Sequence, residues 1–237
     1  MKALEITVRP YQVRRFLLTT ISVLAVMHIA QLCIYFYIDD PDTFDFIQLL
    51  DFDYEGNLPS FYSALALLYC AQQLFWIAKF HSRERDAFIV HWYGLSGIFA
   101  FLAVDEASAL HEEVGDLVES LALFDAEGFL YFAWVVPYGL LLIVFLLSYL
   151  KFLLHLPKNT RQSFLMTGSL FIAGAVGIET LSAQEADVNG TLTIWYSTLY
   201  TLEELFEMVA IALFAHSLLI YQASKHITLE RNVRSHS

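Results

Sequence analysis

Hydrophobic residues are grouped along the chain in six long runs that short polar stretches separate. Each run is close to the ~20 residues that a helix needs to cross ~30 Å of hydrocarbon. The predicted spans are residues 16–38, 59–80, 88–110, 129–154, 164–182 and 194–221. Because the linkers are too short for a folded soluble domain, we expect an all-α, six-transmembrane-helix bundle in which residues 1–237 form a single membrane domain.

Composition agrees with this pattern. Hydrophobic residues make up 57% of the chain and charged residues 16%, and the mean hydropathy is +0.54, which exceeds that of an ordinary soluble domain. The net charge of −12 provides no basic surface for nucleic acid. We therefore expect the lipid bilayer as the main partner and no nucleic-acid partner.

The positive charges lie in alternate linkers. The N-terminal segment contains Lys2, Arg9, Arg14 and Arg15, the second linker Lys79, Arg83 and Arg85, the fourth Lys151, Lys158 and Arg161, and the tail Lys225, Arg231 and Arg234, which together are all 13 Lys and Arg residues. Short loops rich in Lys and Arg stay on the cytoplasmic side. This predicts an integral protein of the cytoplasmic membrane with both termini cytoplasmic and acidic loops on the non-cytoplasmic side.

Acidic residues fill the complementary linkers. The first of these contains Asp39, Asp40, Asp42, Asp45, Asp51, Asp53 and Glu55. We expect these carboxylates to be solvated, but apolar residues are interleaved with them, so an amphipathic segment along the membrane interface is the alternative.

The third predicted span contains two carboxylates, Asp105 and Glu106. A charged, unpartnered carboxylate at such a place costs a few kcal/mol. On a continuous helix, Asp105, Glu112 and Asp116 would lie within about 40° of one another and form an acidic face. His111 would point away from this face, so we expect an interfacial, solvated role for it. A metal ligand reached through a bend is the alternative.

Two further spans bring acids to the same outer half of the membrane. Glu179 follows the small residues Gly174 and Gly177, which allow another helix to approach closely. In the last span, Glu203 and Glu207 are one turn apart with Glu204 beside them, and aliphatic residues occupy the opposite arc. The acids are therefore predicted to face the interior of the bundle. The polar residues His28 and Gln31 of the first span are expected to hydrogen-bond between helices or to line a polar cavity.

These residues define the predicted site. Its candidate metal or cation ligands are Asp105, Glu106, Glu179, Glu203, Glu204 and Glu207, with His111 and Glu112 as secondary candidates. Since no Lys or Arg lies deep within a predicted span, protons, a bound divalent metal ion or water must balance the carboxylates. An oxygen-rich shell suits Mg²⁺, Ca²⁺, Mn²⁺ or iron, and zinc is a further option that the pattern does not separate from them.

The leading hypothesis for function is cation-coupled or proton-coupled transport. A metal-dependent membrane enzyme that acts on a lipid-like substrate is the alternative, although the paired Glu-x-x-His repeats of a di-iron bundle are missing. A structural or assembly protein whose acids fasten helices is the third hypothesis. Cations, or a small or lipid-like substrate, are the expected ligands, and the sequence assigns neither a catalytic residue nor an oligomeric state.

Overall fold

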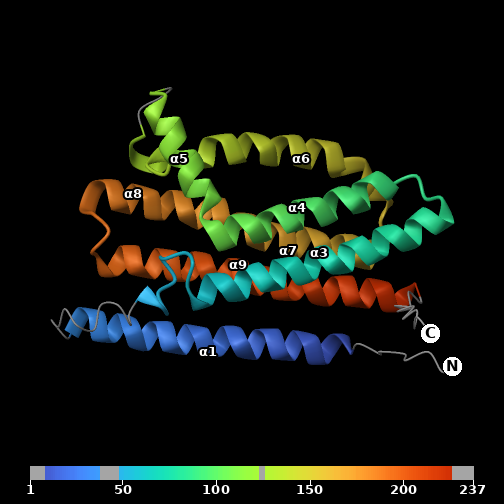
Figure 1. Ribbon diagram of the computed structural model, residues 1–237, viewed down its shortest axis with the longest axis horizontal. Helices are drawn as coiled ribbons and strands as arrows, with labels where there is room; N and C mark the ends of the chain where they lie inside the picture. Colours follow the sequence, from blue (N-terminus) through green and yellow to red (C-terminus); the bar gives the residue numbers. More distant parts are fainter. Residues whose placement is uncertain (1–8, 38–47, 123–125, 226–237) are drawn as a thin grey trace, which may run out of the picture.

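The computed structural model describes residues 9–37, 48–122 and 126–225, and these are helical apart from the connecting turns. The elements are α1 (Pro10–Tyr37), α3 (Leu58–Glu84), α4 (Ile89–Ser108), α5 (Leu110–Ser120), η2 (Gly128–Leu130), α6 (Val135–His155), α7 (Lys158–Ile172), η3 (Ala173–Ile178), α8 (Glu179–Asn189) and α9 (Ile194–Ser224). The long helices run side by side along the longest axis of the molecule (Figure 1).

Within the described residues, five helices are long and apolar enough to cross a membrane. They are α1, α3, α6, the helix from Lys158 to Asn189 that comprises α7, η3 and α8, and α9. A sixth crossing exists if α4 and α5, which meet at 78°, count as one broken span. The prediction of a multi-pass helical bundle is confirmed in this form. The sides of the membrane on which the termini lie, and the single-domain assignment, stay predictions.

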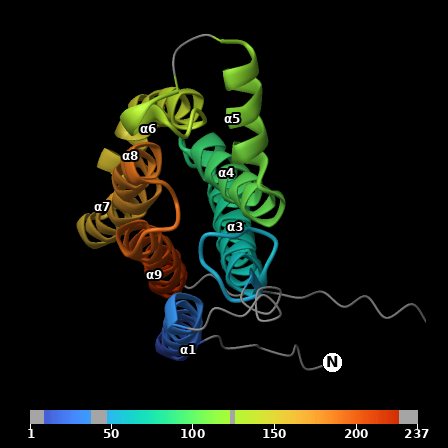
Figure 2. The same cartoon turned by 90° about the vertical axis from the view of Figure 1, so that its left-hand side faces the viewer.

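Helix α9 forms the centre of the bundle, because it contacts α1, α3, α7, η3 and α8. Its residues Met208, Ala212, Ala215 and Leu218 are fully buried. Seen end-on, α3, α4 and α5 lie on one side of the molecule and α6, α7 and α8 on the other, with α1 next to α9 at the base (Figure 2). Helix α6 instead exposes a row of aliphatic side chains, as a lipid-facing helix does.

Several predicted helix ends differ from the observed ones. The fourth predicted span begins six residues early, since residues 128–130 form the short helix η2 and α6 begins only at Val135. The fifth predicted span is too short, because a π-helical turn at 173–178 continues α7 into α8 as far as Asn189. Hydrophobic runs predict where a span lies, whereas its ends depend on local capping and turns.

The segment that precedes α3 is folded onto the bundle. Leu50 and Phe52 are buried, and Leu58 donates its backbone N–H to the carbonyl of Leu49. Asn57 and Ser60 form a capping box at the start of α3, in which the side chain of each residue accepts a hydrogen bond from the backbone N–H of the other. The expectation of solvated carboxylates is therefore wrong for Asp51, which is buried, and for Glu55, which is half-buried, whereas Asp53 is exposed. The acids at 39, 40, 42 and 45 lie outside the described residues.

The two ends of the bundle differ in charge. The beginning of α1 and the end of α9 lie at one end, together with the α3–α4 and α6–α7 connections (Figure 1). This basic end holds the described Lys and Arg residues, which are Arg9, Arg14, Arg15, Lys79, Arg83, Arg85, Lys151, Lys158, Arg161 and Lys225. The opposite, acidic end holds residues 48–57, α5, α8 and the beginning of α9.

Candidate functional site

A sharp bend after α4 shapes the site. Ala109 has a φ of 51° and donates its N–H to the carbonyl of Asp105, so α4 ends and α5 leaves at 78°. The predicted continuous helix through Leu110, and with it the acidic face shared by Asp105, Glu112 and Asp116, is therefore wrong. A left-handed backbone costs a non-glycine residue roughly 1–2 kcal/mol, so the packing around the bend must hold Ala109 in place.

The bend turns His111 back toward the bundle. Its Nδ1 lies 3.4 Å from Oδ2 of Asp105, and its Nε2 lies 3.4 Å from Oε1 of Glu55. Tyr138 of α6 donates its hydroxyl to Oδ1 of Asp105 at 2.9 Å, and the ring of Trp134 packs edge-on against His111. His111 thus bridges two carboxylates, whereas a straight helix would have directed it away from them.

Glu55 comes from the segment before α3 and closes this part of the site. One of its carboxylate oxygens, Oε2, is buried and has no hydrogen-bond partner among the described residues. Burial raises the pKa of Glu55 to about 7, although the neighbouring His111 acts in the opposite direction. Glu55 therefore exchanges its proton near neutral pH.

On the other side of the site, α9 packs closely against the π-helical turn. A Cβ atom at Gly174 would lie 2.9 Å from the backbone oxygen of Glu203 and 3.1 Å from Cγ of Glu207. This approach places Oε2 of the buried Glu203 at 3.4 Å from the hydroxyl of Ser182. The carboxyl group of Glu203 also interacts electrostatically with that of Glu179.

The remaining acids lie between these two groups. Glu106 interacts electrostatically with Glu204, Glu55 and Asp105. Glu207 interacts with Glu106 and Glu179, and Glu204 with Glu207 and Glu55. The structure therefore brings together the six predicted carboxylates and His111. Glu112 lies on the exposed face of α5, with Glu113 and Asp116.

A second polar group adjoins the carboxylates at the acidic end. Tyr196 of α9 donates its hydroxyl to Asp53 at 2.8 Å, and Gln31 donates to the buried Asp51 at 3.1 Å. His28, which is fully buried, lies 2.9 Å from the hydroxyl of Thr201 and stacks on Phe52. His28 and Gln31 thus bond between elements, which is the first of the two roles expected for them.

Sequence reasoning missed Glu55, Asp51 and Asp53 as parts of the site, and it also missed the hydroxyl donors. The interleaving of acids with Leu50 and Phe52 was the available signal, because a fully solvated linker does not need buried apolar residues. Nothing in the sequence indicated that Tyr138 or Tyr196 would face a carboxylate.

The geometry does not form a metal-ligand set. Among residues 9–37, 48–122 and 126–225, no three His, Cys, Asp or Glu side chains are arranged to hold a metal ion. In the same residues, the ion pairs of the site carboxylates involve His111 and His28 and no Lys or Arg. The side chains of the site instead hydrogen-bond to one another in pairs and short chains.

Beyond the site, a mostly apolar layer lies between α3 and α9. Leu74, Ile77 and Leu218 are fully buried in it, and the buried Gln73 and Gln222 hydrogen-bond to each other at 3.1 Å in the same region. Past this layer, His81 lies 2.8 Å from the hydroxyl of Tyr221 and 3.0 Å from Asp86. The carboxylate site is therefore closer to one end of the bundle.

Long apolar helices around a buried polar interior define a multi-pass helical membrane protein. Residues 16–221 match a family described as Domain of unknown function (DUF8692), and the chain belongs to this family. The match begins in α1 and ends in α9, so it covers the bundle and every carboxylate of the site. Neither a curated protein nor a solved structure matches the chain.

Proposed function

We propose that this protein carries out proton-coupled or cation-coupled transport, with the interior carboxylates as the cation-binding groups. One observation carries the proposal: acids from the 48–57 segment, α4, α8 and α9 surround a common interior in which no described Lys or Arg lies. Charge balance then has to come from a proton or another cation, since several unpaired carboxylates in a membrane interior are strongly unfavourable.

The close approach of like-charged carboxyl groups favours protons as the bound species. Glu203 interacts electrostatically with Glu179, so a proton bound by either group would relieve the repulsion between them. His111, placed between Asp105 and Glu55, can pass a proton from one carboxyl group to the other through its two ring nitrogens. Glu55, with its pKa of about 7, would exchange that proton at the acidic end of the bundle.

Flux measurements on purified protein in liposomes test this proposal. With a pH gradient imposed, wild-type protein should dissipate the gradient faster than empty liposomes, and Glu207→Gln should reduce the rate to that of empty liposomes. Glu119→Gln is the matched control, because it removes a carboxylate from the exposed face of α5. A Glu207→Gln protein that keeps the wild-type rate in both pH and metal-ion gradients would refute transport through this site.

A metal-dependent membrane enzyme is the second candidate, and the mostly apolar layer around Leu74 and Leu218 favours it. An enzyme needs access from one side only, whereas transport requires this layer to open. Glu106, Glu203 and Glu204 would have to move together to serve as ligands, because the described side chains do not form a metal-ligand set. The substrate would be lipid-like. Stoichiometric iron, manganese or zinc in the purified protein, lost in both Glu203→Gln and Glu106→Gln, would replace the transport proposal with this one.

A further inference from the structure

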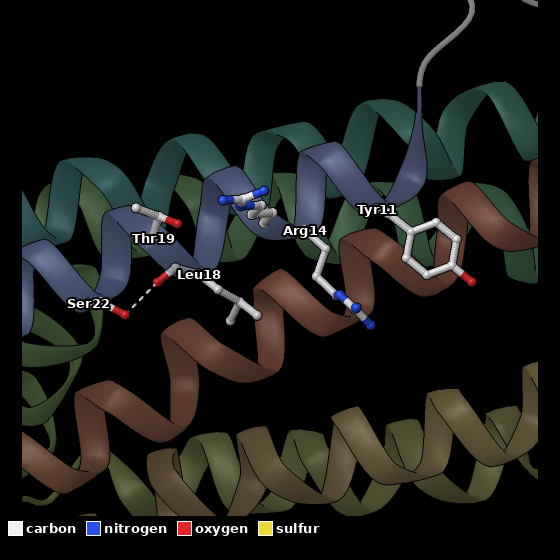
Figure 3. Close-up of a pocket in the computed structure, with 6 residues that line it drawn as sticks. Tyr11, Arg14, Leu18, Thr19 and Ser22 are labelled. Atoms are coloured by element: carbon white, nitrogen blue, oxygen red, sulfur yellow. Dashed lines mark hydrogen bonds between the residues drawn. The ribbon is translucent and has the colours of Figure 1, made fainter.

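A surface hollow of about 430 Å³ lies on α1 at the basic end, far from the carboxylates. It is lined by Tyr11, Arg14, Arg15, Leu18, Thr19 and Ser22. Figure 3 shows Tyr11, Arg14, Leu18 and Ser22 on the side of α1 next to α9, with the polar groups of Tyr11 and Arg14 toward the beginning of the helix. The hollow is therefore cationic at one end and becomes less charged along the helix.

The two arginines of this hollow are available to an anion. In the described part of the chain, neither Arg14 nor Arg15 has a carboxylate within 4 Å. The guanidinium of Arg14 lies 5.3 Å from the ring centroid of Tyr11, and that ring packs against His216 of α9 at 5.1 Å. Arg14 is thus held in place by an aromatic contact, and its N–H donors have no hydrogen-bond partner among the described residues.

The position of the hollow matches the boundary between headgroups and hydrocarbon. Helix α1 has 28 residues, which at 1.5 Å per residue is about 42 Å and exceeds the ~30 Å of a hydrocarbon core. The excess of about 12 Å is enough for its first turns to lie at headgroup level. The exposed Val23 and Val26 would then lie in the hydrocarbon region, and the hydroxyl of Ser22 donates to the carbonyl of Leu18.

We propose that this hollow binds an anionic phospholipid, with its phosphate against Arg14 and Arg15 and an acyl chain running along α1 past Leu18. The guanidinium groups match phosphate oxygens in geometry and charge. Basic pockets beside membrane helices recognise acidic headgroups in this way. The site is separate from the carboxylates, so it does not depend on the proposed transport.

Native mass spectrometry of the detergent-solubilised full chain tests the site, with phosphatidylglycerol as the anionic lipid and phosphatidylcholine as the neutral one. Wild-type protein should retain phosphatidylglycerol preferentially, and the Arg14→Gln/Arg15→Gln variant should bind it about tenfold more weakly. The matched control is Arg83→Gln/Arg85→Gln, which removes two charges from the same end of the bundle and should keep wild-type binding.

A second variant separates the hollow from simple charge attraction. Leu18→Trp fills the hollow without altering charge and should also weaken phosphatidylglycerol binding, while the thermal unfolding midpoint shows whether the variant is folded. The proposal would be overturned if both arginine double variants lost phosphatidylglycerol binding equally, or if a folded Leu18→Trp protein kept full binding. Displacement of the lipid by millimolar inorganic phosphate would also overturn it.

Discussion

His111 joins two carboxylates that belong to segments far apart in the sequence. Asp105 also receives the hydroxyl of Tyr138, so three elements meet at one buried carboxylate. The carboxylates themselves could be predicted from the sequence, because an acid within an apolar run needs a partner. The partners could not be predicted, since the position of His111 depends on the backbone of Ala109 and that of Tyr138 on the packing of another helix.

Glu55 leads to a prediction about pH. Its pKa of about 7, raised by burial, means that the folded protein keeps a proton that the unfolded chain releases near pH 4.5. Stability should therefore fall as the pH rises from about 5 to about 7, by at most about 1.4 kcal/mol per pH unit. Solvent screening of this partly exposed group makes the change smaller than that limit.

The Glu55→Gln variant should lack this part of the pH dependence. Thermal unfolding midpoints in detergent, measured from pH 5 to pH 8, check the prediction, with the exposed Glu119→Gln as control. The charged groups that interact with Glu55 are His111, Glu112, Asp105, Glu106, Glu204 and Glu207, and they are unchanged in both variants. Parallel curves for wild type and Glu55→Gln would show that Glu55 ionises normally in the folded protein.

At the level of elements, two irregular backbone features position the site. Ala109 bends α4 into α5, and the π-helical turn at 173–178 brings Gly174 against α9. Hydrophobic periodicity predicted the spans but neither irregularity, because a bend at alanine and a π-turn have no strong residue signal. The close packing near Gly174 was predictable, since small residues gather before Glu179.

Replacing Ala109 with glycine tests the bend. Glycine adopts a positive φ without strain, so Ala109→Gly should raise the free energy of unfolding by about 1 kcal/mol. Ala107→Gly, in the regular part of α4, should lower it by a similar amount. Chemical denaturation in mixed micelles measures both changes, and a loss of stability in Ala109→Gly would mean that this residue is not left-handed in the folded protein.

Gly174 provides a test of the contact between the π-turn and α9. A methyl group there would meet the backbone of Glu203, which cannot move away as a flexible side chain could. We expect Gly174→Ala to cost about 1–3 kcal/mol of stability. Gly168→Ala is the matched control, because open space surrounds that position and the added helix propensity should be neutral or stabilising. Similar midpoints for the two variants would contradict the close approach.

For the whole molecule, charge is separated between the ends of a helical bundle. The alternation of Lys and Arg along the sequence predicted this separation, and the described basic residues do lie at one end. The contribution of the 48–57 segment to the site was not predictable, because its burial arises from long-range packing on α1 and α9. For the molecule as a whole, we propose that carboxylates from separate helices act as one cation-binding unit.

The most direct test of that claim is a double-mutant cycle on proton flux in proteoliposomes. Glu106 lies on α4 and Glu207 on α9, and the two interact electrostatically. If they serve one site, Glu106→Gln and Glu207→Gln should each stop pH-driven flux, and the double variant should lose no more than either single variant. Partial losses that multiply in the double variant, or wild-type flux in either single variant, would contradict a shared site.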